Sequence, residues 1–174
     1  MPTAVIPTIV PQTLVITRDA GSQPQGCSVH EVATALVDFT TAFSRGDFSL
    51  ATSFVAENFD RFGIGGKSGG EFASIGQLRQ YAVSRHSHKE VWLLQVMDVS
   101  GPAWFGGVGV ALEMRRFADD LGPGLTVSGK ASILCPSRTI QSWELGIGPL
   151  PSKICPEPSG ENTAAVVACA RASG

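Results

Sequence analysis

The sequence predicts an α+β fold in which a curved antiparallel sheet wraps around three N-terminal helices as a cone-shaped α+β barrel. The 174 residues suit one domain with a hydrophobic core. In the first half of the chain, apolar residues recur at spacings of three and four, as in amphipathic helices. In the second half they alternate with polar residues in runs joined by short turns, as in an antiparallel meander. Helices followed by strands are typical of an α+β domain.

The first predicted helix spans residues 28–45. Ser28 and Glu31 form a capping box, in which the hydroxyl accepts from a backbone N–H and the carboxylate reaches back to the cap. Gly46 supplies the left-handed residue that commonly ends a helix. We expect an apolar stripe of this helix to pack against the concave side of the sheet; its members are Val29, Val32, Leu36, Phe39 and Phe43.

A second helix and a glycine-rich segment follow. Asp47 is placed to cap this helix, which we expect to end near Phe59. Residues 62–70 contain five glycines but lack the spacing of a phosphate-binding loop, so they predict a mobile loop at the mouth of the domain. The apolar face predicted for the second helix consists of Leu50, Ala51, Phe54 and Val55.

A third helix precedes the strands. Ser74 and Gln77 repeat the capping-box pattern, and the cationic residues 85–89 suit the negative end of the helix dipole. On the last strand, alternation places Trp143 on one face with Thr139, Gln141 and Leu145. The predicted strands are Val91–Val99, Ala103–Phe117, Leu125–Cys135 and Arg138–Leu145.

The predicted domain occupies residues 28–146. Residues 1–27 are expected to form an extended arm, in which residues 14–17 are able to add an edge strand. Residues 147–174 form a Pro/Gly-rich tail with a short helix predicted over residues 162–172.

Four cysteines, with no C-x-x-C pair, leave two interpretations open: free thiols in a cytoplasmic protein, or disulfides in an exported one. Export is favoured, because Cys155 and Cys169 lie in a tail with little apolar sequence to bury them. We expect at least one disulfide from Cys27 or Cys135 to Cys155 or Cys169. Met1–Gly26 does not have the pattern of a signal peptide, so we expect that a leader is absent from this chain.

The charge pattern argues against several partners. Thirteen basic and fifteen acidic residues leave a net charge of −2 without a polybasic run, so neither nucleic acid nor an anionic membrane is expected. No apolar run approaches the roughly 20 residues of a membrane helix. His86 and His88 have no third ligand at a suitable spacing, so we expect no metal site, and the sequence implies no cofactor.

Several segments share the pattern of one protein family. They are residues 35–47, 54–70, 78–85 and 90–94, together with residues 140–144, which place a tryptophan on the closing strand. This pattern resembles the SnoaL-like branch of the nuclear-transport-factor-two-like superfamily over about residues 28–146. The resemblance implies a ketosteroid-isomerase-like cone. Members of the superfamily include isomerases, cyclases, dehydratases and epoxide hydrolases, alongside proteins that only bind or only assemble.

The resemblance also implies where an isomerase would carry its catalytic groups. A base carboxylate would follow the second helix, and a tyrosine and a protonated carboxylic acid would form the oxyanion hole. Phe62 or Gly63 lies at the position of the base, and Asp60 is close in sequence but out of register with it, and a slip of one position reverses the face in an extended segment. The first helix offers Phe39 and Phe43 in place of a tyrosine. We therefore expect no isomerase turnover.

Dehydratase-like and hydrolase-like patterns need a His–Asp pair or an Asp–Arg–Asp set to activate water. The candidates are Asp60, His86 and Arg115, with Arg116 and Asp98 as further members. Adjacent strand residues face opposite sides, so at most one of the two arginines enters the cone. Either an arginine forms a charged cluster with Asp60, or both are solvated or lie at a dimer face.

Three functions remain open. The first is non-enzymatic binding of a small apolar molecule in the cone, and the second is an interaction or assembly module that forms a homodimer through the outer sheet face. The third is a small-molecule isomerase or lyase. A filled cone would favour assembly, whereas a pocket with converging ionisable groups would favour an enzyme. The residues expected to line a ligand cavity are Phe39, Phe43, Phe54, Phe62, Tyr81 and Trp143.

Overall fold

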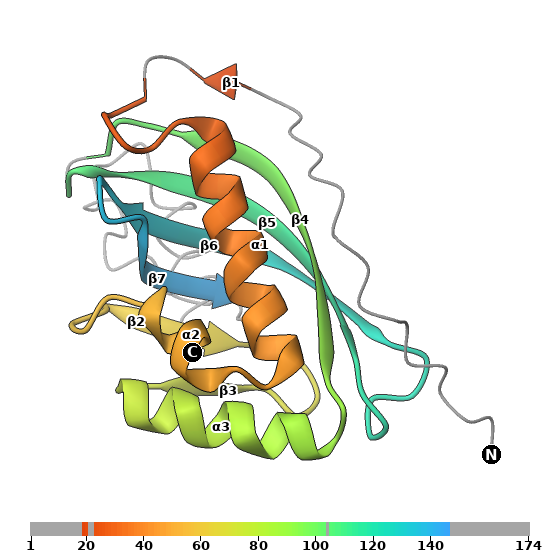
Figure 1. Ribbon diagram of the computed structural model, residues 1–174. Coiled ribbons are helices and arrows are strands. Elements are labelled where there is room, and N and C mark those ends of the chain that lie inside the picture. The colour runs from red at the N-terminus through yellow and green to blue at the C-terminus, as the bar shows by residue number, and fades with distance from the viewer. Residues whose placement is uncertain (1–18, 21–22, 104, 147–174) are drawn as a thin grey trace, which may run out of the picture.

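The computed structural model describes residues 19–20, 23–103 and 105–146, in which one curved sheet carries three helices (Figure 1). The predicted edge strand over residues 14–17 and the predicted tail helix over residues 162–172 lie outside the described residues. The helices are α1 (Val29–Arg45), α2 (Phe48–Ser53) and α3 (Ile75–Ser87). The strands are β1 (Asp19–Ala20), β2 (Arg61–Ile64), β3 (Gly70–Phe72), β4 (Val91–Ser100), β5 (Gly107–Phe117), β6 (Leu125–Leu134) and β7 (Thr139–Leu145).

The sheet confirms the predicted antiparallel meander and extends it at both ends. Strands β4 to β7 pair antiparallel in chain order, within the order β1-β4-β5-β6-β7-β2-β3. At one end β2 lies parallel to β7 and antiparallel to β3, and at the other end β1 lies parallel to β4. In the described residues β1 and β3 are the two edges and do not pair with each other, so the curved sheet remains open.

Helix α1 lies across the concave side of the sheet and packs against β4, as predicted (Figure 1). The backbone N–H of Glu31 donates to Ser28 Oγ at 3.3 Å, and that of Ser28 donates to Glu31 Oε2 at 3.1 Å, which completes the capping box. Gly46 ends the helix with a φ of 78°. The stripe residues Val32, Leu36, Phe39 and Phe43 are all buried.

The segment after α1 differs from the prediction. Asp47 caps α2 by accepting from the backbone N–H of Leu50 at 3.1 Å, but the helix ends at Ser53 and the Leu50 side chain is exposed. The backbone of Phe54 instead accepts from the Ile140 N–H at 2.7 Å, so pairing with β7 overrides helix continuation. The glycine-rich residues 62–70 are also more ordered than predicted, because they contain most of β2 and the first residue of β3.

The last strand contains an irregularity that alternation does not predict. Ser132 pairs with Ser142, but the next pair joins Ile133 to Ile140, which leaves Gln141 between them. Ile140 and Trp143 are therefore both buried although they are three positions apart. The prediction that Trp143 shares its face with Thr139 and Gln141 is therefore wrong, because the alternation is interrupted at this bulge.

One disulfide closes the domain, and its pairing differs from the prediction. Cys27 is bonded to Cys135 across 108 positions, with 5.7 Å between the two Cα atoms. Neither cysteine is therefore available to the tail, and Cys155 and Cys169 lie outside the described residues. The pairing arises because the residue before the Ser28 cap lies beside the β6–β7 turn.

Candidate functional site

Aromatic rings occupy the interior between α1 and the sheet. Phe39 lies 5.2 Å from Trp143 and 6.0 Å from Phe62 between ring centroids, and Phe62 stacks on Trp143 at 5.7 Å. Phe43 stacks on Trp92 with centroids 3.5 Å apart. All five side chains are buried. Four of the six residues expected to line a ligand cavity thus contact other rings in the hydrophobic core.

The other two expected cavity residues lie nearer the surface. Tyr81 is half-buried on α3 and contacts the Phe72 ring at 4.6 Å between centroids. Phe54 lines a surface groove of about 310 Å³ beside α1, together with Asp38 and Arg138. The ligand-binding role of the six residues stays a prediction.

The indole N–H of Trp143 is an exception within this apolar interior. Its Nε1 atom is buried and has no hydrogen-bond partner in the part of the chain that the structure describes. Buried N–H groups are nearly always paired, because leaving one unpaired costs about 1–3 kcal/mol. The Trp143 Nε1 is therefore a donor that an acceptor atom of a bound molecule would satisfy.

A buried carboxylate joins two arginines at one end of the ring cluster. Glu90, just before β4, accepts from Arg116 Nε at 2.7 Å and from Trp92 Nε1 at 2.6 Å, and its second oxygen accepts from Arg85 Nε. Glu90 and Arg116 are completely buried, and only 5% of the Arg85 side chain is exposed. The attraction between these paired charges offsets the free-energy cost of removing them from water, a cost that an isolated buried ion would bear in full.

Arg116 also holds the glycine-rich segment. Its Nη1 donates to the carbonyls of Gly65 at 3.1 Å and Lys67 at 3.2 Å, and its Nη2 donates to the Ser68 carbonyl at 3.0 Å. The hydroxyl of Tyr81 accepts from the same Nη2 at 2.9 Å. The loop between β2 and β3 is thereby fixed to the end of β5 by one side chain.

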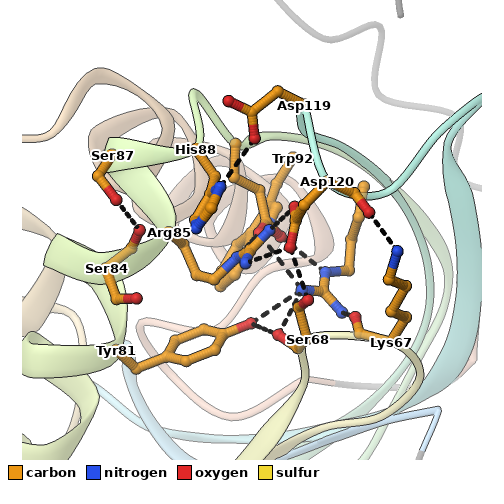
Figure 2. Close-up of polar contacts among 12 residues, drawn as sticks. Lys67, Ser68, Tyr81, Ser84, Arg85, Ser87, His88, Trp92, Asp119 and Asp120 are labelled. Atoms are coloured by element: carbon orange, nitrogen blue, oxygen red, sulfur yellow. Dashed lines mark hydrogen bonds and ion pairs between the residues drawn. The ribbon is translucent and has the colours of Figure 1, made fainter. Parts of the chain in front are cut away.

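Asp120 completes the network from the turn after β5. Arg85 holds its carboxylate in a fork, with Nη2 at 2.5 Å from Oδ1 and Nη1 at 2.9 Å from Oδ2. The hydroxyl of Ser68 donates to Oδ2 at 2.7 Å, and Lys67 Nζ donates to the Asp120 backbone carbonyl at 2.5 Å (Figure 2). Glu90 and Asp120 together balance the charges of Arg85 and Arg116.

The pKa shifts of three groups in this network keep each of them in one protonation state at neutral pH. Hydrogen bonds from Arg85 hold the pKa of the Asp120 carboxyl well below its usual range. Burial, and then the charge of Glu90, raises the pKa of the Tyr81 hydroxyl. Burial lowers the pKa of Arg85, but hydrogen bonds to Asp120 and Glu90 outweigh it and raise the pKa overall. Asp120, Tyr81 and Arg85 are thus poorly suited to exchange protons near pH 7.

Of the two adjacent arginines, Arg116 enters the interior and Arg115 does not. The Arg115 side chain is exposed, with its guanidinium 5.1 Å from the centre of the Phe117 ring. The prediction that at most one of them enters the cone is confirmed. Neither alternative left open by the sequence holds for Arg116, because it is buried and pairs with Glu90, not with Asp60. Asp60 lies at the surface and lines a groove of about 430 Å³ with Phe72 and four other residues.

The two candidate histidines lie at the end of α3. His86 is exposed and meets the Phe48 ring edge to face at 5.7 Å. His88 caps the helix, and its Nδ1 lies 2.8 Å from Asp119 Oδ1. Ligand atoms of His88, Asp119 and Asp120 lie within 4.8 Å of one another, but Arg85 engages both oxygens of Asp120.

Sequence reasoning missed the residues that organise this network. The sequence predicts the end of a helix at Arg85 and the start of a strand at Val91, and it gives no role to Glu90 or Asp120. Because Asp120 follows Arg85 by 35 positions and Arg116 follows Glu90 by 26, no local spacing connects them. The one available signal was the strand alternation that directs Arg116 inward, since a buried arginine requires a carboxylate.

The fold has relatives among solved structures, although the sequence matches no protein-family model and no curated protein. A Methylobium petroleophilum PM1 protein of unknown function with a cystatin-like fold superposes with a TM-score of 0.52, at 12% identity over 75% of this chain and 85% of that chain. A Shewanella oneidensis MR-1 protein of unknown function, described as NTF-2 like, gives a TM-score of 0.47 at 11% identity over 64% of this chain and 92% of that chain. The first of these matches shows that the chain shares the cystatin-like fold of the Methylobium petroleophilum protein.

A second solved structure with a similar fold comes from Xanthomonas campestris. It is named, provisionally, as a calcium/calmodulin dependent protein kinase II association domain, and superposes with a TM-score of 0.52 at 13% identity over 76% of this chain and 97% of that chain. At such identities the similarity establishes the overall fold alone. Within the described residues, none of the helices has the length and apolar character of a membrane span.

Proposed function

We propose that this chain is an interaction module that forms a homodimer through the outer face of its sheet. The observation that carries the proposal is the occupied interior. Phe39, Phe62 and Trp143 contact one another ring to ring, in the region where a small-molecule enzyme of this fold needs space. The ionisable groups at the end of this cluster are held in ion pairs. Both features leave the outer surface as the better candidate for function.

The outer face of the central strands has small and oppositely charged side chains. Across β5, β6 and β7, Ala111 is the register partner of Lys130, which is the partner of Glu144. In a neighbouring row Glu113 is the partner of Ser128. Small side chains let a second sheet approach closely, and adjacent opposite charges allow one patch to complement its own copy about a two-fold axis.

The Xanthomonas campestris relative adds limited support, since its name describes an association domain. Its similarity concerns the fold, so the dimer proposed here rests on the occupied interior and the surface pattern. A polar face of this kind predicts a dimer that dissociates at low concentration rather than an obligate one.

The proposal is tested by placing a bulky charge at the centre of the outer face. Ser128 is exposed on β6, so Ser128→Arg should give a monomer in sedimentation experiments where the unmodified chain is a dimer. Ser84→Arg is the matched control, because Ser84 is exposed on α3, away from the sheet. Both variants should keep the melting temperature of the monomeric fold. A monomeric unmodified chain, or a Ser128→Arg dimer, would contradict the proposal.

A second candidate function is binding of a small apolar molecule with one acceptor atom. The unpaired Nε1 of Trp143 favours it, because a carbonyl group would satisfy this buried donor. Binding would require the rings of Phe39, Phe43 and Phe62 to separate and make room for the ligand. Phe54 and Tyr81 would line the part of the cavity nearer the surface. Incubation with steroid-like and polyketide-like ketones should then show binding without conversion. Turnover that disappears in Asp60→Asn would make Asp60 a catalytic base and this chain an isomerase.

We also propose that the protein acts outside the cytoplasm. The Cys27–Cys135 disulfide supports this location, because disulfides persist in oxidising compartments. Thiol alkylation of intact cells before lysis should leave Cys27 and Cys135 unlabelled. Labelling of both would place the protein in a reducing compartment.

A further inference from the structure

We propose that Arg85, Ser68 and Lys67 form an oxyanion-binding site that the Asp120 carboxylate occupies from within the chain, in competition with small carboxylates or phosphate. The donors come from α3 and from the loop between β2 and β3, whereas Asp120 comes from the turn between β5 and β6. Figure 2 shows Lys67, Ser68 and Arg85 gathered around Asp120. This site is independent of the outer sheet face.

The geometry around Asp120 is that of a bound anion. The two terminal nitrogens of Arg85 meet the two carboxylate oxygens at 2.5 and 2.9 Å, the fork that matches carboxylate and phosphate. Ser68 Oγ adds a third donor at 2.7 Å. Lys67 Nζ lies at the Asp120 backbone carbonyl, which keeps a further positive charge beside the site. A free oxyanion has acceptors for all of these groups.

The charge balance explains why the site needs an anion. Arg85 and Arg116 are buried side by side against Glu90, which balances one of their two positive charges. Asp120 balances the other. Removing the Asp120 carboxylate would leave one buried guanidinium charge without a counterion, and such a charge is strongly unfavourable. The vacated site is thereby poised to take up an anion from solution.

Asp120 is the part of the site best placed to leave. Its side chain is 25% exposed, whereas that of Arg85 is 5% exposed, so the carboxylate separates the guanidinium from solvent. It lies in the Ala118–Gly124 turn, where Gly122 has a φ of 72° and a side chain at that position would meet open space. The neighbouring Asp119 carboxylate points to His88, 2.8 Å away, and not to Arg85.

The test compares Asp120→Ala with Asp119→Ala in the full-length chain. Each variant is titrated with sodium acetate, sodium phosphate and sodium chloride at matched ionic strength and pH 7, and the melting temperature and heat of binding are measured. Asp120→Ala should show saturable stabilisation by acetate or phosphate that chloride does not give. Asp119→Ala keeps Asp120 in place and should behave as the unmodified chain does, with much weaker binding of acetate or phosphate than Asp120→Ala. If Asp120→Ala does not fold in chloride, the yield of refolded protein is measured in acetate and in chloride instead of the melting temperature. The yield should be higher in acetate.

Two further measurements separate a built site from a general salt effect. Adding Ser68→Ala to Asp120→Ala should weaken anion binding about tenfold, because a hydrogen bond to a charged group is lost. In the unmodified chain, competition by Asp120 should weaken apparent binding by about tenfold to a hundredfold. A response to acetate alone identifies a carboxylate site, and a response to phosphate alone identifies a phosphate site. The proposal is overturned if the two alanine variants respond equally or if chloride reproduces the effect. It is also overturned if the unmodified chain does not bind the anion about tenfold to a hundredfold more weakly than Asp120→Ala.

Discussion

Arg116 and Glu90 form a completely buried ion pair, with 2.7 Å between Nε and Oε1, because two neighbouring strands deliver them to the same point. Arg116 on β5 is the register partner of Trp92 on β4, and Glu90 immediately precedes β4. Trp92 and Arg116 both donate to the same carboxylate oxygen. The cluster is thus fixed by strand register as well as by charge.

Glu90→Gln should lower the free energy of unfolding by about 3–5 kcal/mol, because two buried guanidinium groups lose their shared anion. Urea denaturation of the variant and the unmodified chain measures the difference. Glu113→Gln is the matched control on the outer face of β5, where a change within about 0.5 kcal/mol is expected. Equal, small effects of the two substitutions would show that the buried pair contributes nothing to stability.

Phe43→Ala should lower the free energy of unfolding by about 3–5 kcal/mol, because it leaves a cavity beside Trp92 in the core. Phe117→Ala removes the same atoms from a half-exposed position on the outer face and should cost about 1 kcal/mol. Thermal melts of both variants provide the comparison. An unchanged melting temperature for Phe43→Ala would contradict the packing of α1 described above.

Removing the disulfide by Cys27→Ala with Cys135→Ala should lower the free energy of unfolding by roughly 4–5 kcal/mol, since the bond closes a loop of 108 residues. Non-reducing peptide mapping should first recover a peptide pair that joins Cys27 to Cys135. Recovery of either cysteine joined to Cys155 or Cys169 would refute this pairing.

Acid should remove the stabilising contribution of Asp120. Because its pKa is lowered in the folded chain, the contribution is fully present above the unfolded pKa of about 3.9 and is lost as the pH falls towards the folded pKa. The stability difference between the unmodified chain and Asp120→Asn should therefore be constant above about pH 5 and shrink below about pH 4. Denaturation curves collected from pH 7 to pH 2 measure it.

Glu31 provides the comparison for the acid experiment. Hydrogen bonds from Ser28 lower the pKa of its carboxyl too, so its effect has the same sign. The group is exposed, however, and Glu31→Gln should reduce the acid sensitivity much less than Asp120→Asn. A larger effect at Glu31 would assign the acid-sensitive contribution to the α1 cap.

The elements that could be predicted from the sequence are those fixed by local chemistry. Ser28, Glu31 and Gly46 define the two ends of α1 through contacts within a few residues, and the structure confirms both ends. The same holds for the meander, whose strands are separated by short turns. The end of α2 cannot be predicted from local sequence, because Phe54 pairs with Ile140, a partner that is distant in sequence.

The candidate site was less predictable for a related reason. Strand alternation directs Arg116 inward, but its partner follows from the register between β4 and β5, which alternation does not define. Asp60 is nearer than Glu90 to the glycine-rich segment in the sequence and was the natural candidate, yet it faces the surface. The predicted cysteine pairing is wrong for a similar reason, because the spacing of cysteines in the sequence does not reveal that the start of α1 lies beside the β6–β7 turn.

The position of β7 within the sheet has a consequence for how the protein is made. This strand is the last of the described elements in the chain, yet it lies between β6 and β2 and joins the two halves of the sheet. A chain emerging from the ribosome therefore exposes the unpaired edges of β6 and β2 until residue 145 is available. Completion of the domain has to wait until β7 has been synthesised, and nascent chains stalled before β7 are expected to require protection by chaperones.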